Sequence, residues 1–452
     1  MRTITTVVIF LCVTSSYGQN IQDIIDQVDL GNLTVTLNEF SGEQTTTVNG
    51  NTVSIIDRRQ AVNDIAADYL IERFQELDNI TITDQSFNTN GRNIIATQLG
   101  KTNPENIYMI CAHYDTVTNF CADDNASGTG AILEIARILS TQCLDNTIVY
   151  ALWDEEEIGL FGSAFYATQA QTDNDNILGV YNIDMIAYDG DGDNSFDIDV
   201  KQGDAGSIAM GNAIINVLNS YTFNLNHNLI NPGTEQSDHS SFWNRGFPAA
   251  LVGEAWSEND QNDQYHTSGD VVSNLNLSFY HEMVKLSAAY MATVGGLVAV
   301  DNTITLSTTA LTSNQSTGTY QWVNCDTNTP IAGATNQTFM PSVNGNYAVE
   351  VTSGTCFEIS NCIAFNSLSL ATFLESEITI FPNPVSDELK IESHTDSQDL
   401  ELKLYTVSGK LVFDTSSSEN LISIHMKSFP QGTYFLSVRS DKKSGTYKIV
   451  KE

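Results

Sequence analysis

Three apolar runs that end in acidic or histidine side chains constrain the fold more than any other feature of this sequence. ENIYMICAHYD (105–115), NTIVYALWD (146–154) and ILGVYNIDMIA (177–187) are too apolar to lie on a surface. They indicate buried strands, and the helical pattern GTGAILEIARILS (128–140) separates the first two. Buried strands that alternate with helices favour an α/β fold, in which helices flank a mostly parallel mixed sheet.

The composition changes after residue 302. A chain of 452 residues exceeds what one hydrophobic core usually serves. Beyond this point Thr, Ser, Asn and Gly dominate, with short apolar alternations such as GNYAVEVTS (345–353). This pattern predicts two small all-β sandwich domains, joined by a linker around 366–376. We expect the α/β domain at 19–300 and the two β modules at 303–366 and 375–452.

The first 18 residues, MRTITTVVIFLCVTSSYG, have the basic start, apolar stretch and small-residue end of a secretory signal peptide. Removing them leaves six cysteines, at positions 111, 121, 143, 325, 356 and 362. An even number in an exported chain suggests disulfides. Three cysteines are early and three are late. If the two groups belong to separate domains, at least one thiol in each group stays free or pairs across domains.

The balance of charge excludes two classes of partner. Lys+Arg number 19 and Asp+Glu 55, which gives a formal net charge of -36. Such a chain repels nucleic acid phosphates and anionic membranes, so we expect neither as a partner, and no membrane span. We interpret the acidity as solvation of an exported protein and not as attraction for basic ligands.

Ionisable side chains gather where the expected strands end. They are His113, Asp115, Asp124, Glu156, Glu157, Asp184 and, further along the chain, His266. Each could be an ordinary loop residue, but several would meet at one edge of the sheet, where open α/β sheets build their sites. Carboxylates crowded in one crevice repel each other, and divalent cations relieve that repulsion. Imidazole and carboxylate are zinc ligands.

Six motifs occur in an order that resembles one family. They are HYD at 113, ADDNASG at 122, EEIGLFGS at 156, NIDMI at 182, SDHSSFWNRGFPAALVGE at 237 and YHTSGD at 265. Together they resemble the zinc aminopeptidases of peptidase family M28, from about residue 60 to 295. The resemblance implies a secreted metallo-exopeptidase that hydrolyses residues from the amino ends of peptides.

The resemblance also implies a site with two Zn²⁺ ions. Asp124 would bridge both ions, His113 and Asp184 would complete the ligands of one, and Glu157 and His266 those of the other. Glu156 would be the general base, and Asp115 would orient His113. In this family the peptide bond after the bridging aspartate is cis, so we expect a cis bond between Asp124 and Asn125.

Some alternatives stay open. Glutaminyl cyclases and carboxypeptidases share the fold, although EEIGLFGS favours a peptidase; an inactive surface-binding protein is disfavoured because every ligand and the base are present. Some members carry an oxyanion-stabilising tyrosine before SDH, where this chain has NPGTEQ (231–236), so that group is open. Asp238 and His239 could shape the pocket or be structural. DGDGDN (189–194) indicates an acidic turn, with a calcium loop as the alternative.

The C-terminal third contains two further resemblances. The segment around YQWVNC (320–325) is similar to bacterial immunoglobulin-like repeats, for which we expect a spacer role over carbohydrate or surface binding. FPNPVSDELKIE (381–392), LYTVSGKLV (404–412) and FPQGTYFLSV (429–438) resemble the type A sorting domain of the type IX secretion system. That implies contact with the secretion machinery, export through the periplasm to the cell surface or medium, and removal of the tail.

Overall fold

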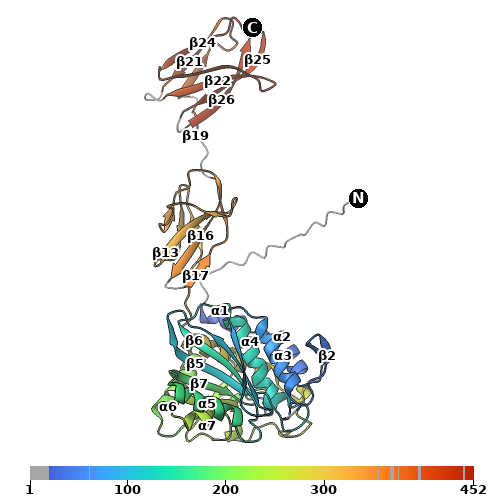
Figure 1. Ribbon diagram of the computed structural model, residues 1–452. Coiled ribbons are helices and arrows are strands. Elements are labelled where there is room, and N and C mark those ends of the chain that lie inside the picture. Colours follow the sequence, from blue (N-terminus) through green and yellow to red (C-terminus); the bar gives the residue numbers. More distant parts are fainter. Residues whose placement is uncertain are drawn as a thin grey trace.

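The computed structural model describes residues 20–60, 62–353, 356–366, 371–374, 376–394, 399–440 and 443–452. The signal peptide expected at 1–18 lies outside them. Three bodies follow one another along the described part of the chain (Figure 1): a helix-covered sheet that begins at residue 20 and ends near residue 300, a small β module in orange, and a second β module in red. Among the described residues, no helix combines the length and the apolar character that a membrane span needs.

The first body is built on an eight-stranded mixed sheet, in the order β3-β4-β6-β5-β7-β10-β8-β9. The strands are β3 (Thr81–Ser86), β4 (Arg92–Gln98), β5 (Asn103–His113), β6 (Asn146–Trp153), β7 (Ile177–Ile183), β8 (Ser195–Val200), β9 (Asn226–Ile230) and β10 (Ala249–Glu254). The central strands β6, β5, β7 and β10 run parallel, and the outer pairs are mostly antiparallel. The predicted α/β class with a mixed sheet is confirmed.

Helices cover both faces of this sheet. They are α1 (Ile21–Asp26), α2 (Leu30–Phe40), α3 (Asp64–Gln75), α4 (Gly128–Leu139), α5 (Phe161–Asp173), α6 (Ala205–Ser220), α7 (His239–Trp243) and α8 (Leu277–Gly295), with a hairpin of β1 (Thr46–Val48) and β2 (Asn51–Val53) beside them. In β6, alternate residues enter different cores: Ile148, Tyr150 and Leu152 join the larger one, while Val149 and Trp153 join the other. A strand buried on both faces has no polar side, which explains the unbroken apolar runs of the sequence.

The middle module is all-β. One sheet holds β11 (Ile304–Leu306), β12 (Leu311–Ser313) and β15 (Thr338–Phe339); the other holds β13 (Thr319–Asn324), β14 (Thr329–Pro330), β16 (Gly345–Ser353), β17 (Cys356–Ile359) and β18 (Ile363–Phe365). All its pairs are antiparallel. Leu311 from the first sheet and Trp322 and Val349 from the second share one core, so the two sheets pack face to face.

The C-terminal module is also all-β. Its larger sheet holds β19 (Ala371–Thr372), β22 (Leu400–Thr406), β23 (Leu411–Ser417), β25 (Gly432–Arg439) and β26 (Lys443–Lys451); its smaller sheet holds β20 (Ile378–Phe381), β21 (Glu388–Ser393) and β24 (Leu421–His425). Leu389 and Ile391 from the smaller sheet pack with Leu402 and Leu436 from the larger. The separate cores support the division at 19–300, 303–366 and 375–452, which stays our proposal.

Two disulfides explain the unequal grouping of the cysteines. Cys325 pairs with Cys362 inside the middle module, and Cys143 of the α/β body pairs with Cys356 of β17. Cys111 and Cys121 are buried free thiols. Of the two outcomes that the sequence left open, pairing across domains therefore occurs. It joins the middle module covalently to the α/β body at a second place, besides the chain connection near residue 300.

Candidate active site

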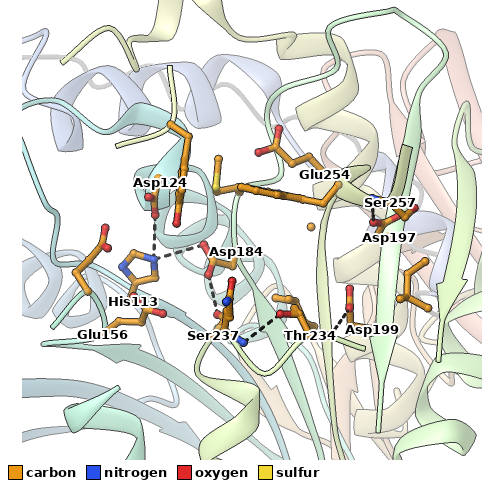
Figure 2. A pocket seen from close by; sticks show the side chains of 18 residues that line it. His113, Asp124, Glu156, Asp184, Asp197, Asp199, Thr234, Ser237, Glu254 and Ser257 are labelled. Carbon is orange, nitrogen blue, oxygen red and sulfur yellow. Dashed lines mark hydrogen bonds and ion pairs between the residues drawn. The ribbon is translucent and has the colours of Figure 1, made fainter. Parts of the chain in front are cut away.

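The acidic and histidine side chains expected at the strand ends meet at one edge of the sheet. His113 is the last residue of β5, Glu156 and Glu157 follow β6, and Asp184 follows β7. Asp124 lies in the irregular turn Ala122–Ser127 before α4. These five side chains line a cavity of about 330 Å³ (Figure 2). His266 lies beside two of them, Asp124 and Glu157.

Two groups of ligand atoms share Asp124. His113 Nε2 lies 3.2 Å from Asp124 Oδ1 and 3.4 Å from Asp184 Oδ1. His266 Nε2 lies 3.3 Å from Asp124 Oδ2 and 3.3 Å from Glu157 Oε2. The two oxygens of one carboxylate therefore face two different imidazoles, as a bridging ligand requires.

These distances fit zinc better than they fit hydrogen bonds. Tetrahedral zinc with nitrogen and oxygen ligands at its usual bond lengths holds neighbouring ligand atoms about 3.3–3.5 Å apart. A charge-assisted hydrogen bond from imidazole to carboxylate is shorter, about 2.7–2.9 Å. In addition, Asp124 Oδ2 and Glu157 Oε1 are buried and have no hydrogen-bond partner among the described residues. The donor set thus suits divalent cations.

The charges in the cavity are unbalanced. Burial raises the pKa of Glu157 to about 9, and the charge of Asp124 adds to the shift. Burial also raises the pKa of Glu156, with the nearby Asp184 and Glu157 carboxylates contributing. Burial alone would lower the pKa of His113, but the surrounding carboxylates outweigh it and the pKa is raised. More carboxylates meet here than two imidazoles can neutralise, and this crowding together with burial opposes ionisation of both glutamates.

Asp115 connects His113 to the two glutamates. Its Oδ1 accepts the backbone N–H of Glu156 at 3.1 Å, and its Oδ2 accepts that of Glu157 at 3.3 Å. His113 Nδ1 lies 3.2 Å from the Asp115 carbonyl oxygen and 3.5 Å from Oδ1. A proton held on Nδ1 leaves Nε2 free as an acceptor or ligand. Glu155 has a positive φ of 60°, so the chain turns sharply after β6 and the next two side chains diverge.

Comparison with known proteins agrees with this geometry. Residues 93–291 match the model of peptidase family M28. The chain carries a peptidase M28 domain. Residues 379–452 match the model of the secretion system C-terminal sorting domain, which implies export to the medium or the cell surface.

Several relatives of this M28 domain are peptidases. Aminopeptidase Y of Saccharomyces cerevisiae is 31% identical over 211 residues, covering 45% of this chain and 38% of the yeast protein. Leucine aminopeptidase 2 of Trichophyton rubrum is 31% identical over 209 residues, 41% of each chain. A probable zinc metalloprotease of Pyricularia oryzae is 38% identical over 110 residues, 22% of each. The chain thus spans less than half the length of these relatives, and the name of the last one supports zinc as the metal.

Solved structures support the fold. The LapA aminopeptidase of Legionella pneumophila superimposes with a TM-score of 0.54 at 20% identity, covering 66% of this chain and 80% of LapA. At this identity the likeness establishes a shared fold.

The loop that carries Asp124 is held by donors and acceptors from other elements. The bond between Asp124 and Asn125 is cis, as the resemblance implied. Asp270 accepts the backbone N–H groups of Asp123 and Asp124, and Asn125 Nδ2 donates to the Ile183 carbonyl at 2.8 Å. The motif YHTSGD therefore contributes both His266 and Asp270, the carboxylate that fixes the opposite loop.

Arg58 contacts the chain directly before the Asp124 loop, through the carbonyl oxygens of Phe120 and Cys121. This role was not expected from the sequence. Arg58 is fully buried, and its guanidinium donates to the carbonyl oxygens of Phe40, Tyr114, Phe120 and Cys121 at 2.6–3.0 Å. These acceptors come from three distant segments that meet behind Asp124. Arg58 stabilises their arrangement through charge-assisted hydrogen bonds.

Other positions settle or refine expectations from the sequence. Ser237 Oγ donates to Asp184 Oδ2 at 2.7 Å, so the SDH segment positions a candidate ligand. His239 contacts the Thr234 carbonyl through Nε2 at 2.8 Å and packs edge-on against Trp243, which indicates a structural role. Tyr265 was not expected at the site from the sequence, but it lines the cavity directly before His266.

The acidic turn at 189–194 brings Asp189, Asp191 and Asp193 close enough to hold an ion. Each of the three carboxylates nevertheless accepts backbone N–H groups of the turn itself, including those of Gly192, Asp193 and Ser195. These bonds explain the acids as turn-forming residues, and calcium binding stays an untested alternative.

We predict that Arg58→Met destabilises the M28 domain by about 3 kcal/mol or more, because several buried carbonyl groups lose a charged donor. The thermal unfolding midpoint of the zinc-loaded protein should fall by several degrees. Arg59→Met is the matched control, since Arg59 is half-exposed and forms an ion pair with Asp57 on the surface. Equal midpoints for the two variants would contradict the role given to Arg58.

Proposed function

We propose that this exported M28 domain is a zinc aminopeptidase that removes residues from the amino ends of peptides. The observation that carries the proposal is the pair of histidine–carboxylate groups that share Asp124 beside Glu156, an acid that belongs to neither group. The similarity to aminopeptidases over the M28 region supports the same activity.

The ligand assignment follows from the two groups. His113 and Asp184 would hold one Zn²⁺, Glu157 and His266 a second, and Asp124 would contribute one oxygen to each. When bound, the ions supply Lewis acidity that polarises a substrate carbonyl and acidifies water. Asp115 keeps the His113 ring oriented and holds the Glu156–Glu157 turn in place, so its role is positioning.

Glu156 is the best candidate for the general base. It lines the cavity, is nearly buried, and forms no close contact with either imidazole. A carboxylate in this position would take a proton from the attacking water and return it to the leaving amine. The Tyr265 hydroxyl is the donor that we assign to the developing oxyanion, because Tyr265 lines the cavity and its ring stacks on that of His266. Burial and the charges of Asp124 and Asp184 raise the pKa of Tyr265, so the hydroxyl keeps its proton.

Blocking the amino end of a peptide tests directly which end of the substrate the enzyme hydrolyses. We predict that the zinc-loaded enzyme hydrolyses dipeptides and tripeptides with a free amino end, and that acetylation of that amine abolishes hydrolysis. The assay follows released amino acids by mass spectrometry. Cleavage of the acetylated peptides from their carboxyl end would favour a carboxypeptidase, and cyclisation of amino-terminal glutamine without hydrolysis would favour a glutaminyl cyclase.

Substitutions of the two adjacent glutamates should have different effects on turnover and on zinc binding. Glu156→Gln is expected to retain zinc and the fold while turnover falls at least about 10²-fold, because a positioned base is lost. Glu157→Gln is expected to lose zinc as well as activity, because an amide is a poorer ligand than a carboxylate. Bound zinc, measured by atomic emission, and kcat distinguish the two variants.

Near-normal turnover in Glu156→Gln with zinc retained would remove Glu156 as the base. Tyr265→Phe in the same assays should keep zinc and lower kcat more than KM changes, because only the charged intermediate needs the hydroxyl. Tyr188→Phe is the matched control, since Tyr188 is partly exposed and lies outside the cavity lining.

The sorting domain generates a prediction about export. Deleting residues from 375 onward should leave the peptidase activity of the purified protein intact, because the core of the C-terminal module is separate from that of the M28 domain. In the native cell the truncated chain should accumulate inside the envelope. Immunoblots of cell fractions and medium measure this, and normal release of the truncated chain would contradict the proposed contact with the secretion machinery.

A further inference from the structure

The far end of the cavity is formed by two aspartates of β8. In the segment SFDIDV, Phe196, Ile198 and Val200 pack into the core on one face of the sheet. Asp197 and Asp199 alternate with them, point to the other face and line the cavity, although they are only 4% and 7% exposed. A buried strand that directs two neighbouring carboxylates into a cavity requires an explanation, because burying like charges together is costly.

The protein neutralises these carboxylates only in part. Asp197 accepts from the Ser257 N–H and hydroxyl at 2.7 Å each and from the Asn228 side-chain amide at 3.2 Å, all of which are neutral donors. Asp199 Oδ1 accepts the Thr234 N–H at 2.7 Å. No hydrogen bond to Asp199 Oδ2 is found among the described residues, and neither carboxylate forms an ion pair with a described Lys, Arg or His. Burial, with the charge of Asp197 adding, raises the pKa of Asp199 to about 6.

The strand register gives the distance from these acids to the candidate zinc ligands. Asp184 follows Ile183, which pairs with Val252 of β10, and the next residue, Gly253, pairs with Asp197. Asp184 and Asp197 are thus two strands apart, about 10 Å. Gly253 adds no side chain between them, and a Cβ at this position would lie only 2.6 Å from the Asp184 carbonyl oxygen. Figure 2 shows His113 and Asp184 on one side of the cavity and Asp197 and Asp199 on the other.

We infer that Asp197 and Asp199 bind the side chain of the substrate's first residue and select lysine and arginine. This inference rests on the proposed function and names its substrate class. With the scissile carbonyl at the zinc ligands, an extended lysine places its ammonium nitrogen about 6 Å beyond its Cα, and arginine reaches slightly further. The lengths of the lysine and arginine side chains therefore suit the distance of two strands between Asp184 and Asp197.

The α-amino group of the substrate is not an alternative occupant. Its nitrogen lies only about 2.5 Å from the carbonyl carbon, so it stays near the zinc ligands and does not reach β8. Apolar side chains line the cavity next to Asp199: Leu251 of β10 lies between Asp199 and the candidate zinc ligands, and Ile230 of β9 lies on its far side. Such a surface suits the methylene stem of lysine or arginine, while the charged end meets the carboxylates.

The test compares aminoacyl p-nitroanilides of lysine, arginine and norleucine on the zinc-loaded full chain. Norleucine has a straight aliphatic chain like that of lysine but lacks the ammonium group. We expect kcat/KM for lysine and arginine to exceed that for norleucine at least tenfold. Asp199→Asn should reduce this ratio at least tenfold, because a neutral amide replaces the open carboxylate. Asp173→Asn, an exposed acid at the end of α5, is the matched control and should preserve the ratio.

Calorimetric binding of free L-lysine and L-norleucine separates the inference from the proposed function. Turnover of norleucine equal to that of lysine overturns the inference and leaves the aminopeptidase standing. If no substrate is cleaved, but lysine binds at least tenfold more tightly than norleucine and Asp199→Asn removes the difference, the pocket is supported and the proposed activity fails. Absence of both cleavage and binding preference overturns both.

Discussion

Repulsion between carboxylates at one edge of the sheet is the constraint on which the rest of the M28 domain depends. Asp124, Asp184, Glu156 and Glu157 converge there because parallel strands end at the same edge. Backbone N–H groups hold the segments that carry these acids in place. Asp124 donates its N–H to Asp270, and Glu156 and Glu157 donate theirs to Asp115. These contacts orient the acids, and divalent cations would supply the missing positive charge.

The same sheet serves stability and recognition on opposite faces. Along β8 the residues facing the larger core are apolar, whereas those facing the cavity are Asp197 and Asp199. Strand periodicity makes this division possible, since neighbouring residues point to opposite faces. Gly253 on the adjacent strand places no side chain of its own between Asp184 and Asp197. Recognition can therefore change through two positions without disturbing the core.

Features carried by continuous motifs could be predicted from the sequence, and features assembled from distant segments could not. The central strands were predictable because burial on both faces leaves unbroken apolar runs that end in the acids. SFDIDV gave no such signal, because Asp197 and Asp199 interrupt its apolar pattern. Arg58 and Arg59 are adjacent in DRRQ, and only the carbonyls of remote residues such as Phe40 and Tyr114 distinguish the buried one.

The position of the cross-domain disulfide explains how a module can be attached without obstructing the cavity. Cys143 precedes β6, and Leu144 bridges to Leu297 where the chain leaves the domain, so both connections lie at the edge of the sheet where β6 begins. The candidate zinc ligands lie where β5 and β6 end.

Disulfides form in oxidising compartments, so this attachment would be completed during export. Burial raises the pKa of Cys111 and of Cys121, so neither free thiol readily forms the thiolate that would exchange with the disulfide. The modules are thus attached at one end of the sheet, and the cavity lies at the other end.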